Sequence, residues 1–226
     1  MGYLVKELFA TLQGEGANTG RAAVFCRFTG CNLWTGHEEH RPSAICQFCD
    51  TDFVGTDGPG GGRFASAADL AAAAERVWCE GVGSGEGGHD AVDDAASDEA
   101  RFIVCTGGEP LLQLDRSLVD ALHEHGFEIA IETNGTRPAP DGLDWVCVSP
   151  KAGAELVLEE GDELKLVYPQ AGLDPASFED LDFGRFFLQP MDGPELARNT
   201  ALAVAYCRAH PRWRLSLQTH KLLGIP

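Results

Sequence analysis

Three cysteines lie in one stretch of the chain and have the spacing of a metal site. Cys31, Cys46 and Cys49 form a Cys-x14-Cys-x2-Cys pattern, and Phe48 directly precedes the last of them. In a protein from a reducing compartment, a Cys-x2-Cys pair is typical of metal binding or redox chemistry rather than of a structural disulfide. The three thiols therefore predict a metal centre.

Two kinds of centre are compatible with these thiols. Zinc would take the cysteines together with His37 or His40 of the same loop, although both histidines belong to a strongly polar run, residues 36–41, typical of a solvated loop tip. An iron–sulfur cluster held by only three thiolates would leave one iron open to a substrate or cofactor. The remaining cysteines occur singly on predicted strands and helices and are expected in the core: Cys26, Cys79, Cys105, Cys147 and Cys207.

The elements around the cysteine loop predict an α/β fold. Short apolar runs predict strands over residues 3–9 and 22–29, and Ser66 caps a helix predicted to end at Glu80. Further strands are predicted at 101–105, 128–132, 144–149, 163–167, 185–189 and 214–217, and helices at 110–125, 175–180 and 194–210. Near-continuously apolar strands that alternate with helices are typical of a parallel sheet. At 226 residues the chain is shorter than a complete eight-unit barrel of roughly 250 residues, so we expect a partial, open β/α barrel of about six units.

We expect one domain, residues 1–226, with two unusual segments. Residues 30–63 form a long loop that holds the three cysteines, and a structureless stretch of that length is usually functional. Residues 81–99 are rich in Gly, Asp and Ser and carry almost no large apolar side chain, which predicts an exposed, mobile insertion.

Charge and hydropathy narrow the ligand class. The chain has 17 basic and 35 acidic side chains and a net charge of −18, so neither nucleic acid nor an anionic membrane is expected as the main partner. It contains no apolar run long enough for a membrane span and no signal peptide pattern. These features predict a cytoplasmic protein that acts on small molecules.

Eight short segments, in order along the whole chain, resemble those of one enzyme family. They are 11–16 (TLQGEG), 25–28 (FCRF), 49–51 (CDT), 106–110 (TGGEP), 132–136 (ETNGT), 149–151 (SPK), 189–192 (QPMD) and 218–221 (QTHK). Together they resemble the 7-carboxy-7-deazaguanine synthase family of radical S-adenosylmethionine enzymes. Fourteen residues rather than the usual three separate the first two cysteines, so eleven additional residues (14 − 3) are expected to fold over the cluster.

The resemblance implies a reaction and a set of cofactors. Cys31, Cys46 and Cys49 would hold a 4Fe–4S cluster whose open iron binds S-adenosylmethionine, and Thr51 would bind Mg²⁺ together with the substrate. The implied reaction is the ring contraction of 6-carboxy-5,6,7,8-tetrahydropterin to 7-carboxy-7-deazaguanine and ammonia, in queuosine biosynthesis. An electron donor such as flavodoxin and a homodimeric state are also implied. Two alternatives are a radical activase that acts on a protein glycine and a zinc-binding interaction module.

The resemblance also implies which residues bind each ligand. The residues implied for S-adenosylmethionine are Phe48, Gly108, Glu109, Ser149, Pro150, Lys151, Gln189, Pro190, Met191 and Asp192. The residues implied for the pterin are Leu12, Gln13, Gly14, Arg27, Thr106 and Pro226. Glycines at a strand end allow the backbone to approach the cofactor closely, and Glu109 offers an acceptor for the ammonium group of the cofactor.

Two of the substrate residues also have a physical rationale. Arg27 stands on an otherwise apolar strand and needs an anionic partner, which is either a substrate carboxylate or an internal acid. The chain end, residues 222–226, is short and apolar, so it is expected to be docked, with Gly224 allowing a bend and Ile225 anchored in the core. The carboxylate of Pro226 would then accept hydrogen bonds from the 2-amino group and ring N–H of the pterin.

Overall fold

The computed structural model describes residues 2–82 and 101–226. Most of the predicted insertion, residues 83–99, therefore lies outside the described residues. The strands are β1 (Tyr3–Leu12), β2 (Ala22–Phe28), β3 (Gly62–Phe64), β4 (Arg101–Gly107), β5 (Phe127–Thr133), β6 (Trp145–Val148), β7 (Glu160–Gly161), β8 (Glu163–Tyr168), β9 (Asp182–Phe183), β10 (Phe186–Pro190) and β11 (Trp213–Leu215). The α-helices are α1 (Ala67–Gly81), α2 (Arg116–Glu124), α3 (Leu196–Ala209) and α4 (Thr219–Leu223), and the short 3₁₀ turns are η1 (Gly16–Asn18), η2 (Glu38–Ser43), η3 (Pro110–Leu112) and η4 (Pro175–Phe178).

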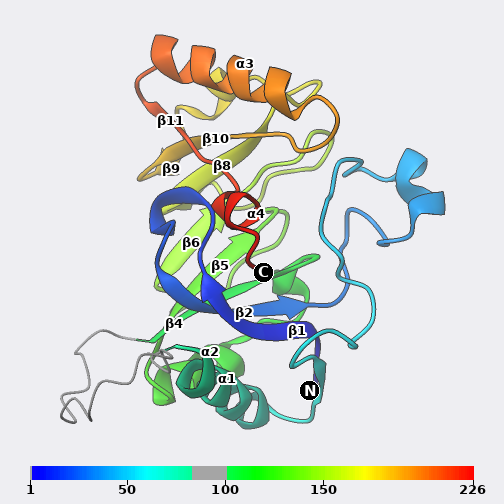
Figure 1. The fold of residues 1–226 in the computed structure, drawn as a ribbon, viewed down its shortest axis with the longest axis vertical. Coiled ribbons are helices and arrows are strands. Elements are labelled where there is room, and N and C mark those ends of the chain that lie inside the picture. Colours follow the sequence, from blue (N-terminus) through cyan, green and yellow to red (C-terminus); the bar gives the residue numbers. More distant parts are fainter. Residues whose placement is uncertain (1, 83–100) are drawn as a thin grey trace.

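One large, mostly parallel sheet forms the frame of the molecule. Its strand order is β11-β10-β8-β6-β5-β4-β2-β1-β3, with parallel pairing from β2 through β11 and antiparallel pairing of β1 with β2 and β3. In the described ranges β3 and β11 are the two edges of this sheet and do not pair with each other (Figure 1). The predicted fold class, a partial and open α/β barrel, is therefore confirmed.

Helices cover the two flanks of the sheet. In Figure 1, α1 and α2 lie below the strands and α3 lies above them. The first flank buries Leu70 and Leu118 against Ile103 in a core of fully buried aliphatic side chains. The second flank buries Leu164 and Trp213 beneath α3. No helix within the described residues is long and apolar enough to cross a membrane.

The predicted helix over 110–125 is interrupted. It consists of η3 and, after a break at residues 113–115, the separate helix α2. The Asp115 side chain accepts a hydrogen bond from the backbone N–H of Leu118 at 3.0 Å, and it therefore starts a new helix. Helix α4 and strand β3, which were not predicted, are only five and three residues long, too short to show a periodic pattern.

The five single cysteines do not all lie in the core. Cys26, Cys105 and Cys147 are buried, as predicted, and Cys207 is partly buried. The prediction is wrong for Cys79, which is exposed on α1. Burial raises the pKa of the Cys26, Cys105 and Cys147 thiols.

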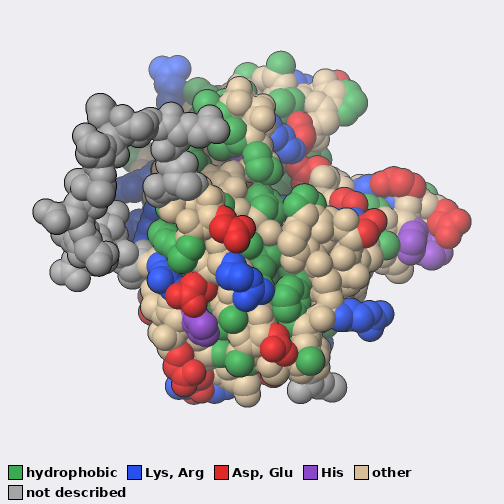
Figure 2. Space-filling model, turned by 60° about the horizontal axis from the view of Figure 1, so that its bottom comes forward, with side chains coloured by type: hydrophobic (Ala, Val, Ile, Leu, Met, Phe, Trp, Pro, Cys, Tyr) green, Lys and Arg blue, Asp and Glu red, His purple; other side chains and the backbone are tan. Residues whose placement is uncertain are grey.

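The cysteine loop carries a lobe that projects from the body of the molecule. The loop between Cys31 and Cys46 contains η2, which lies at the right of Figure 1. Figure 2 shows acidic and histidine side chains gathered on the lobe at the right of that view. Because residues 37–40 are all exposed, the prediction of a solvated loop tip is confirmed.

Candidate active site

The carboxyl ends of the parallel strands surround one cavity of about 380 Å³. This is the edge at which β/α barrels bind their ligands. Seventeen of the twenty predicted site residues line the cavity, and the three that do not are Thr106, Glu109 and Pro150. The structure therefore brings together segments that lie as far apart in the sequence as Gln13 and Pro226.

The three loop cysteines line this same cavity. The interaction between the Cys46 and Cys49 thiols lowers the pKa of Cys49 to about 6 and raises the pKa of Cys46. Burial raises the pKa of Cys31, whose sulfur accepts a hydrogen bond from the backbone N–H of Leu33 at 3.4 Å. The site thus presents three free thiols, one of which is readily ionised.

The chemistry of these donors fits a cluster better than a zinc ion. His37 and His40 do not line the cavity, and Nδ1 of His40 instead lies 2.8 Å from Oγ1 of Thr35. In the part of the chain that the structure describes, no three His, Cys, Asp or Glu side chains converge on one point as ligands of a single ion. A 4Fe–4S cluster would take each cysteine on a different iron, so it does not require three side chains to converge on one point.

Lys151 places a positive charge beside the cysteines. Its ammonium donates to the carbonyl oxygen of Ser149 at 2.7 Å and to Oγ of Ser149 at 2.6 Å, and it lies 6.0 Å from the ring centre of Phe48. Burial lowers the pKa of Lys151, and the nearby sulfurs of Cys46 and Cys49 oppose this effect. A half-buried cation in this position complements an anionic cluster or a cofactor carboxylate.

Glu109 is buried rather than presented to the cavity. It is 0% exposed, and its carboxylate accepts hydrogen bonds from Oγ1 of Thr133 at 2.7 Å and from the backbone N–H groups of Leu111 and Asn134 at 2.9 and 2.8 Å. Burial raises its pKa. These contacts fix the end of β4 relative to the end of β5, and a direct bond from Glu109 to the cofactor ammonium stays a prediction.

Gly108 allows the end of β4 to pass close to the cysteine loop. A β-carbon at this position would lie 2.1 Å from the carbonyl oxygen of Gly30 and 2.9 Å from Cβ of Cys31. Any side chain would therefore displace Gly30 or Cys31. The expected close backbone approach occurs here between β4 and the loop itself.

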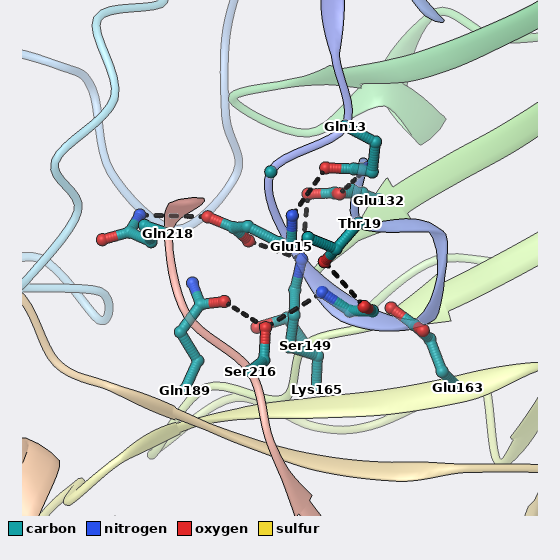
Figure 3. A network of polar contacts seen from close by, with 12 residues as sticks. Gln13, Glu15, Thr19, Glu132, Ser149, Glu163, Lys165, Gln189, Ser216 and Gln218 are labelled. Carbon is teal, nitrogen blue, oxygen red and sulfur yellow. Dashed lines mark hydrogen bonds and ion pairs between the residues drawn. The ribbon is translucent and has the colours of Figure 1, made fainter. Parts of the chain in front are cut away.

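A buried network of charges forms one wall of the cavity (Figure 3). The Lys165 ammonium lies 2.6 Å from Oε2 of Glu15 and 3.3 Å from Oε2 of Glu132, and its side chain is only 4% exposed. Gln13 donates to Oε1 of Glu132 at 2.9 Å, and Gln218 donates to Oε1 of Glu15 at 3.0 Å. Burial alone would raise the pKa of Glu15, but the charge and hydrogen bond of Lys165 lower it to about 2.

Sequence patterns alone predict no role for the three charged members of this network, Lys165, Glu15 and Glu132. Strand β8 was predicted as a near-continuous apolar strand, yet Glu163 and Lys165 point into the barrel and alternate with Leu164 and Leu166, which point to the core under α3. The sequence does contain a sign of this arrangement. Glu163 and Lys165 occupy alternate positions of the strand, and alternate side chains of a strand face the same side, so the two charges must share one face.

Arg27 has an internal partner. Its Nε lies 2.6 Å from Oε1 of Glu7, and the two residues are paired across β1 and β2. The internal acid, one of the two partners expected for Arg27, is therefore present. Both side chains line the cavity, and a contact between Arg27 and a substrate carboxylate stays a prediction.

The chain end reaches the cavity through Pro226, but the expected docking of its apolar side chains is not found, because Leu222 is 75% and Leu223 64% exposed. Thr219 donates to the carbonyl oxygen of Gly14 through both its backbone N–H and its Oγ1, at 2.9 and 3.0 Å. Gly224 adopts a left-handed φ of 67° and bends the chain after α4, and Thr11 donates to an oxygen of Pro226 at 2.7 Å. Ile225, expected in the core, is only half-buried.

Thr51 lines the cavity between two acids that are already paired. Asp50 lies 2.5 Å from the ammonium of Lys221, and Asp52 lies 3.0 Å from that of Lys6. Because both flanking carboxylates are held by lysines, a cation at Thr51 would take most of its ligands from the substrate and water.

An open, largely parallel barrel whose strand ends surround a three-cysteine loop defines a radical S-adenosylmethionine enzyme. No protein-family model matches the chain. It is similar over its full length to 7-carboxy-7-deazaguanine synthases, with 62% identity to that of Bradyrhizobium diazoefficiens and 61% to that of Bordetella pertussis, each match covering 100% of both chains. The crystal structure of QueE from Escherichia coli has a TM-score of 0.62 at 28% identity and matches 96% of this chain and 94% of its own. The chain belongs to the 7-carboxy-7-deazaguanine synthase family, and is therefore a ring-contracting radical S-adenosylmethionine lyase.

Proposed function

We propose that the chain converts 6-carboxy-5,6,7,8-tetrahydropterin to 7-carboxy-7-deazaguanine and ammonia, a step of queuosine biosynthesis. The observation that carries this proposal is one cavity lined both by Cys31, Cys46 and Cys49 and by the polar groups of Gln13 and the chain end. The two products together contain all the atoms of the substrate, so the reaction needs no net oxidant. When bound, a 4Fe–4S cluster and S-adenosylmethionine would supply the 5′-deoxyadenosyl radical that takes a hydrogen atom from the substrate.

The cysteine side of the cavity would hold the cofactors. Cys31, Cys46 and Cys49 would hold the cluster, and the S-adenosylmethionine would lie against the strand ends at Gly108, Ser149 and Gln189. The Lys151 ammonium, fixed by Ser149, offers a partner for the cofactor carboxylate. The residues of this side bind, orient and exclude water, because a carbon radical must meet only one substrate hydrogen. The full set proposed for the cofactor is Phe48, Gly108, Glu109, Ser149, Pro150, Lys151, Gln189, Pro190, Met191 and Asp192.

The opposite side would recognise the pterin. Glu15 and Glu132 line the cavity, and their side-chain oxygens can accept hydrogen bonds from ring N–H groups. The terminal carboxylate at Pro226 is a third acceptor, suited to an amino group and ring N–H side by side. Arg27 would pair with the carboxylate of the substrate. Leu12, Gln13, Gly14 and Thr106 complete the proposed substrate site.

Metal analysis of anaerobically purified protein tests the cofactor part of this proposal. We expect brown protein with about four irons and four sulfides per chain, and an electron paramagnetic resonance signal after reduction that S-adenosylmethionine perturbs. Stoichiometric zinc with no iron would instead support the zinc-binding module.

The Mg²⁺ role of Thr51 has its own test. We expect Thr51→Ala to remove the stimulation of turnover by Mg²⁺, because a hard cation prefers oxygen ligands and alanine has none to offer. Thr51→Ser keeps the hydroxyl and should respond to Mg²⁺ as the wild type does. Turnover that is indifferent to Mg²⁺ in all three proteins would show that no such site operates.

Lys165→Met should damage both stability and substrate binding. Removing the cation leaves Glu15 and Glu132 buried together without a counter-charge, which costs about 3 kcal/mol in the free energy of unfolding, measured with urea. One of the two carboxyls should then take up a proton and cease to accept a hydrogen bond from the pterin, which raises the pterin KM.

The control for Lys165→Met is Arg116→Gln, which removes the exposed ion pair of Arg116 with Asp120. It should change the free energy of unfolding by less than about 1 kcal/mol. Equal stabilities of the two variants would show that the buried pair contributes nothing.

The stabilising effect of Glu15 also depends on pH. Because folding lowers the pKa of Glu15 from 4.5 to about 2, its contribution to the free energy of unfolding is present at neutral pH and is lost as the pH falls through that range.

We propose a one-electron donor such as flavodoxin, a homodimer and a cytoplasmic location. Light scattering at the mass of one chain, 24.2 kDa, would exclude the dimer.

A further inference from the structure

One lysine of α4 joins three segments of the cavity wall. The ammonium of Lys221 lies 2.5 Å from Oδ2 of Asp50 and 2.6 Å from Oδ2 of Asp192. Asp50 directly follows the cluster ligand Cys49, and Asp192 follows the end of β10. Helix α4 therefore has one cation placed between the cysteine loop and the strand edge proposed for the cofactor.

A second residue of the same segment supports this connection. The Gln218 amide donates to Oε1 of Glu15 at 3.0 Å and to Oδ2 of Asp50 at 3.3 Å. On the other side, α4 is packed so closely on the turn after β1 that a β-carbon on Gly14 would lie 2.2 Å from Nδ1 of His220. The C-terminal segment, residues 218–226, thus spans from the pterin side of the cavity to the cysteine loop.

Lys221 supplies the positive charge between two carboxylates, those of Asp50 and Asp192. The Asp50 and Asp192 carboxylates both contact the Lys221 ammonium, so they lie close enough to repel each other without it. The net charge of −18 leaves few other cations in the chain that could take its place. Among the described residues, Asp50 and Asp192 have no ion pair except with Lys221. The hydrogen bond from Lys221 lowers the pKa of Asp192.

We propose that Lys221 is a positioning residue that couples substrate recognition to the cysteine loop. By tying α4 to Asp50 and Asp192, it sets the position of the terminal carboxylate at Pro226. The Pro226 carboxylate then occupies its position at the cavity only when the cysteine loop and the end of β10 hold Asp50 and Asp192 within reach of Lys221. This inference rests on the proposed function, because it takes the chain end to be the part that reads the pterin.

Such coupling has two measurable consequences. Without Lys221 the chain end keeps its hydrogen bonds to Thr11, Gly14 and, through Gln218, to Glu15 and Asp50, but it loses its only ion pairs with the cavity wall among the described residues, so the pterin binds more weakly. A loosely held substrate also lets the radical be quenched elsewhere, so more 5′-deoxyadenosine is released per product formed. Because the ion pairs are partly exposed, we expect Lys221→Gln to raise the pterin KM by roughly threefold to tenfold.

The experiment compares Lys221→Gln with the wild type, with Lys221→Arg and with a matched control. The control, Arg198→Gln, removes one positive charge and one exposed ion pair, that with Glu195, from α3. Hydrogen exchange is measured on residues 218–226, together with iron content, the pterin KM and the ratio of 5′-deoxyadenosine to product.

For Lys221→Gln we expect faster hydrogen exchange in residues 218–226 and a higher KM for the pterin. We also expect a higher ratio of 5′-deoxyadenosine to product and an unchanged iron content. Lys221→Arg should recover most of the protection, because a guanidinium can pair with both acids. Arg198→Gln should match the wild type throughout. If Lys221→Gln exchanges and turns over like the wild type, or if it loses its iron, the coupling role is wrong. If the wild type itself makes no product from the pterin, the proposed function fails instead.

Discussion

Alanine in place of Cys31, Cys46 or Cys49, one at a time, should abolish both the iron–sulfur cluster and turnover. All three thiols line the cavity at the carboxyl edge of the sheet, and no other cysteine of the described residues does. A cluster with only two protein ligands is poorly held, so iron content and activity should fall together. The measurement is iron and sulfide per chain, with turnover assayed on the same preparation.

Cys79→Ala is the matched control for this series. Cys79 is exposed on α1 and does not line the cavity, so its replacement should leave iron content and turnover unchanged. A cluster that survives in Cys46→Ala, or disappears in Cys79→Ala, would contradict the assignment of the ligands.

Extra residues after Pro226 should severely weaken pterin binding. The extension removes the terminal carboxylate from its place beside Thr11 and converts it to a peptide bond. Two hydrogen bonds to a charged acceptor are lost at once, each contributing about 1.5 kcal/mol, so the pterin KM should rise roughly a hundredfold. The measurement is steady-state turnover of a protein extended by two glycines.

Iron content and S-adenosylmethionine binding serve as controls for the extension. Both should remain at the level of the wild type, because the cysteines and the strand ends at Ser149 and Gln189 belong to other segments of the cavity. The alternative role for the chain end is that Ile225 merely covers the open side of the barrel. An extended protein with the wild-type pterin KM would establish that alternative.

The positions of most site residues followed from simple rules of α/β folds. The runs around Gly108, Lys151 and Gln189 each end a predicted parallel strand, and such strand ends share one edge of the sheet. The three cysteines share one loop, so their proximity was predictable without knowledge of the fold. These residues do line one cavity.

The buried charge network was not predictable in the same way. Lys165 pairs with Glu15 across 150 residues of sequence, and no spacing rule connects them. Single charges in apolar strands indicate that a partner exists, as at Arg27, but only the strand register identifies that partner as Glu7. Short elements were missed for a related reason, since helix α4, with five residues, is formed mainly by its tertiary contacts.

The central claim is that this chain contracts the ring of a carboxylated pterin by radical chemistry. Its most direct test is anaerobic incubation of the iron-loaded protein with 6-carboxy-5,6,7,8-tetrahydropterin, S-adenosylmethionine, Mg²⁺ and a reductant, with products identified by mass spectrometry. We expect 7-carboxy-7-deazaguanine and ammonia in equal amounts, formed without any partner protein when a chemical reductant supplies the electron. Cleavage of S-adenosylmethionine with no conversion of the pterin, or activity only toward a glycine of another protein, would contradict the account.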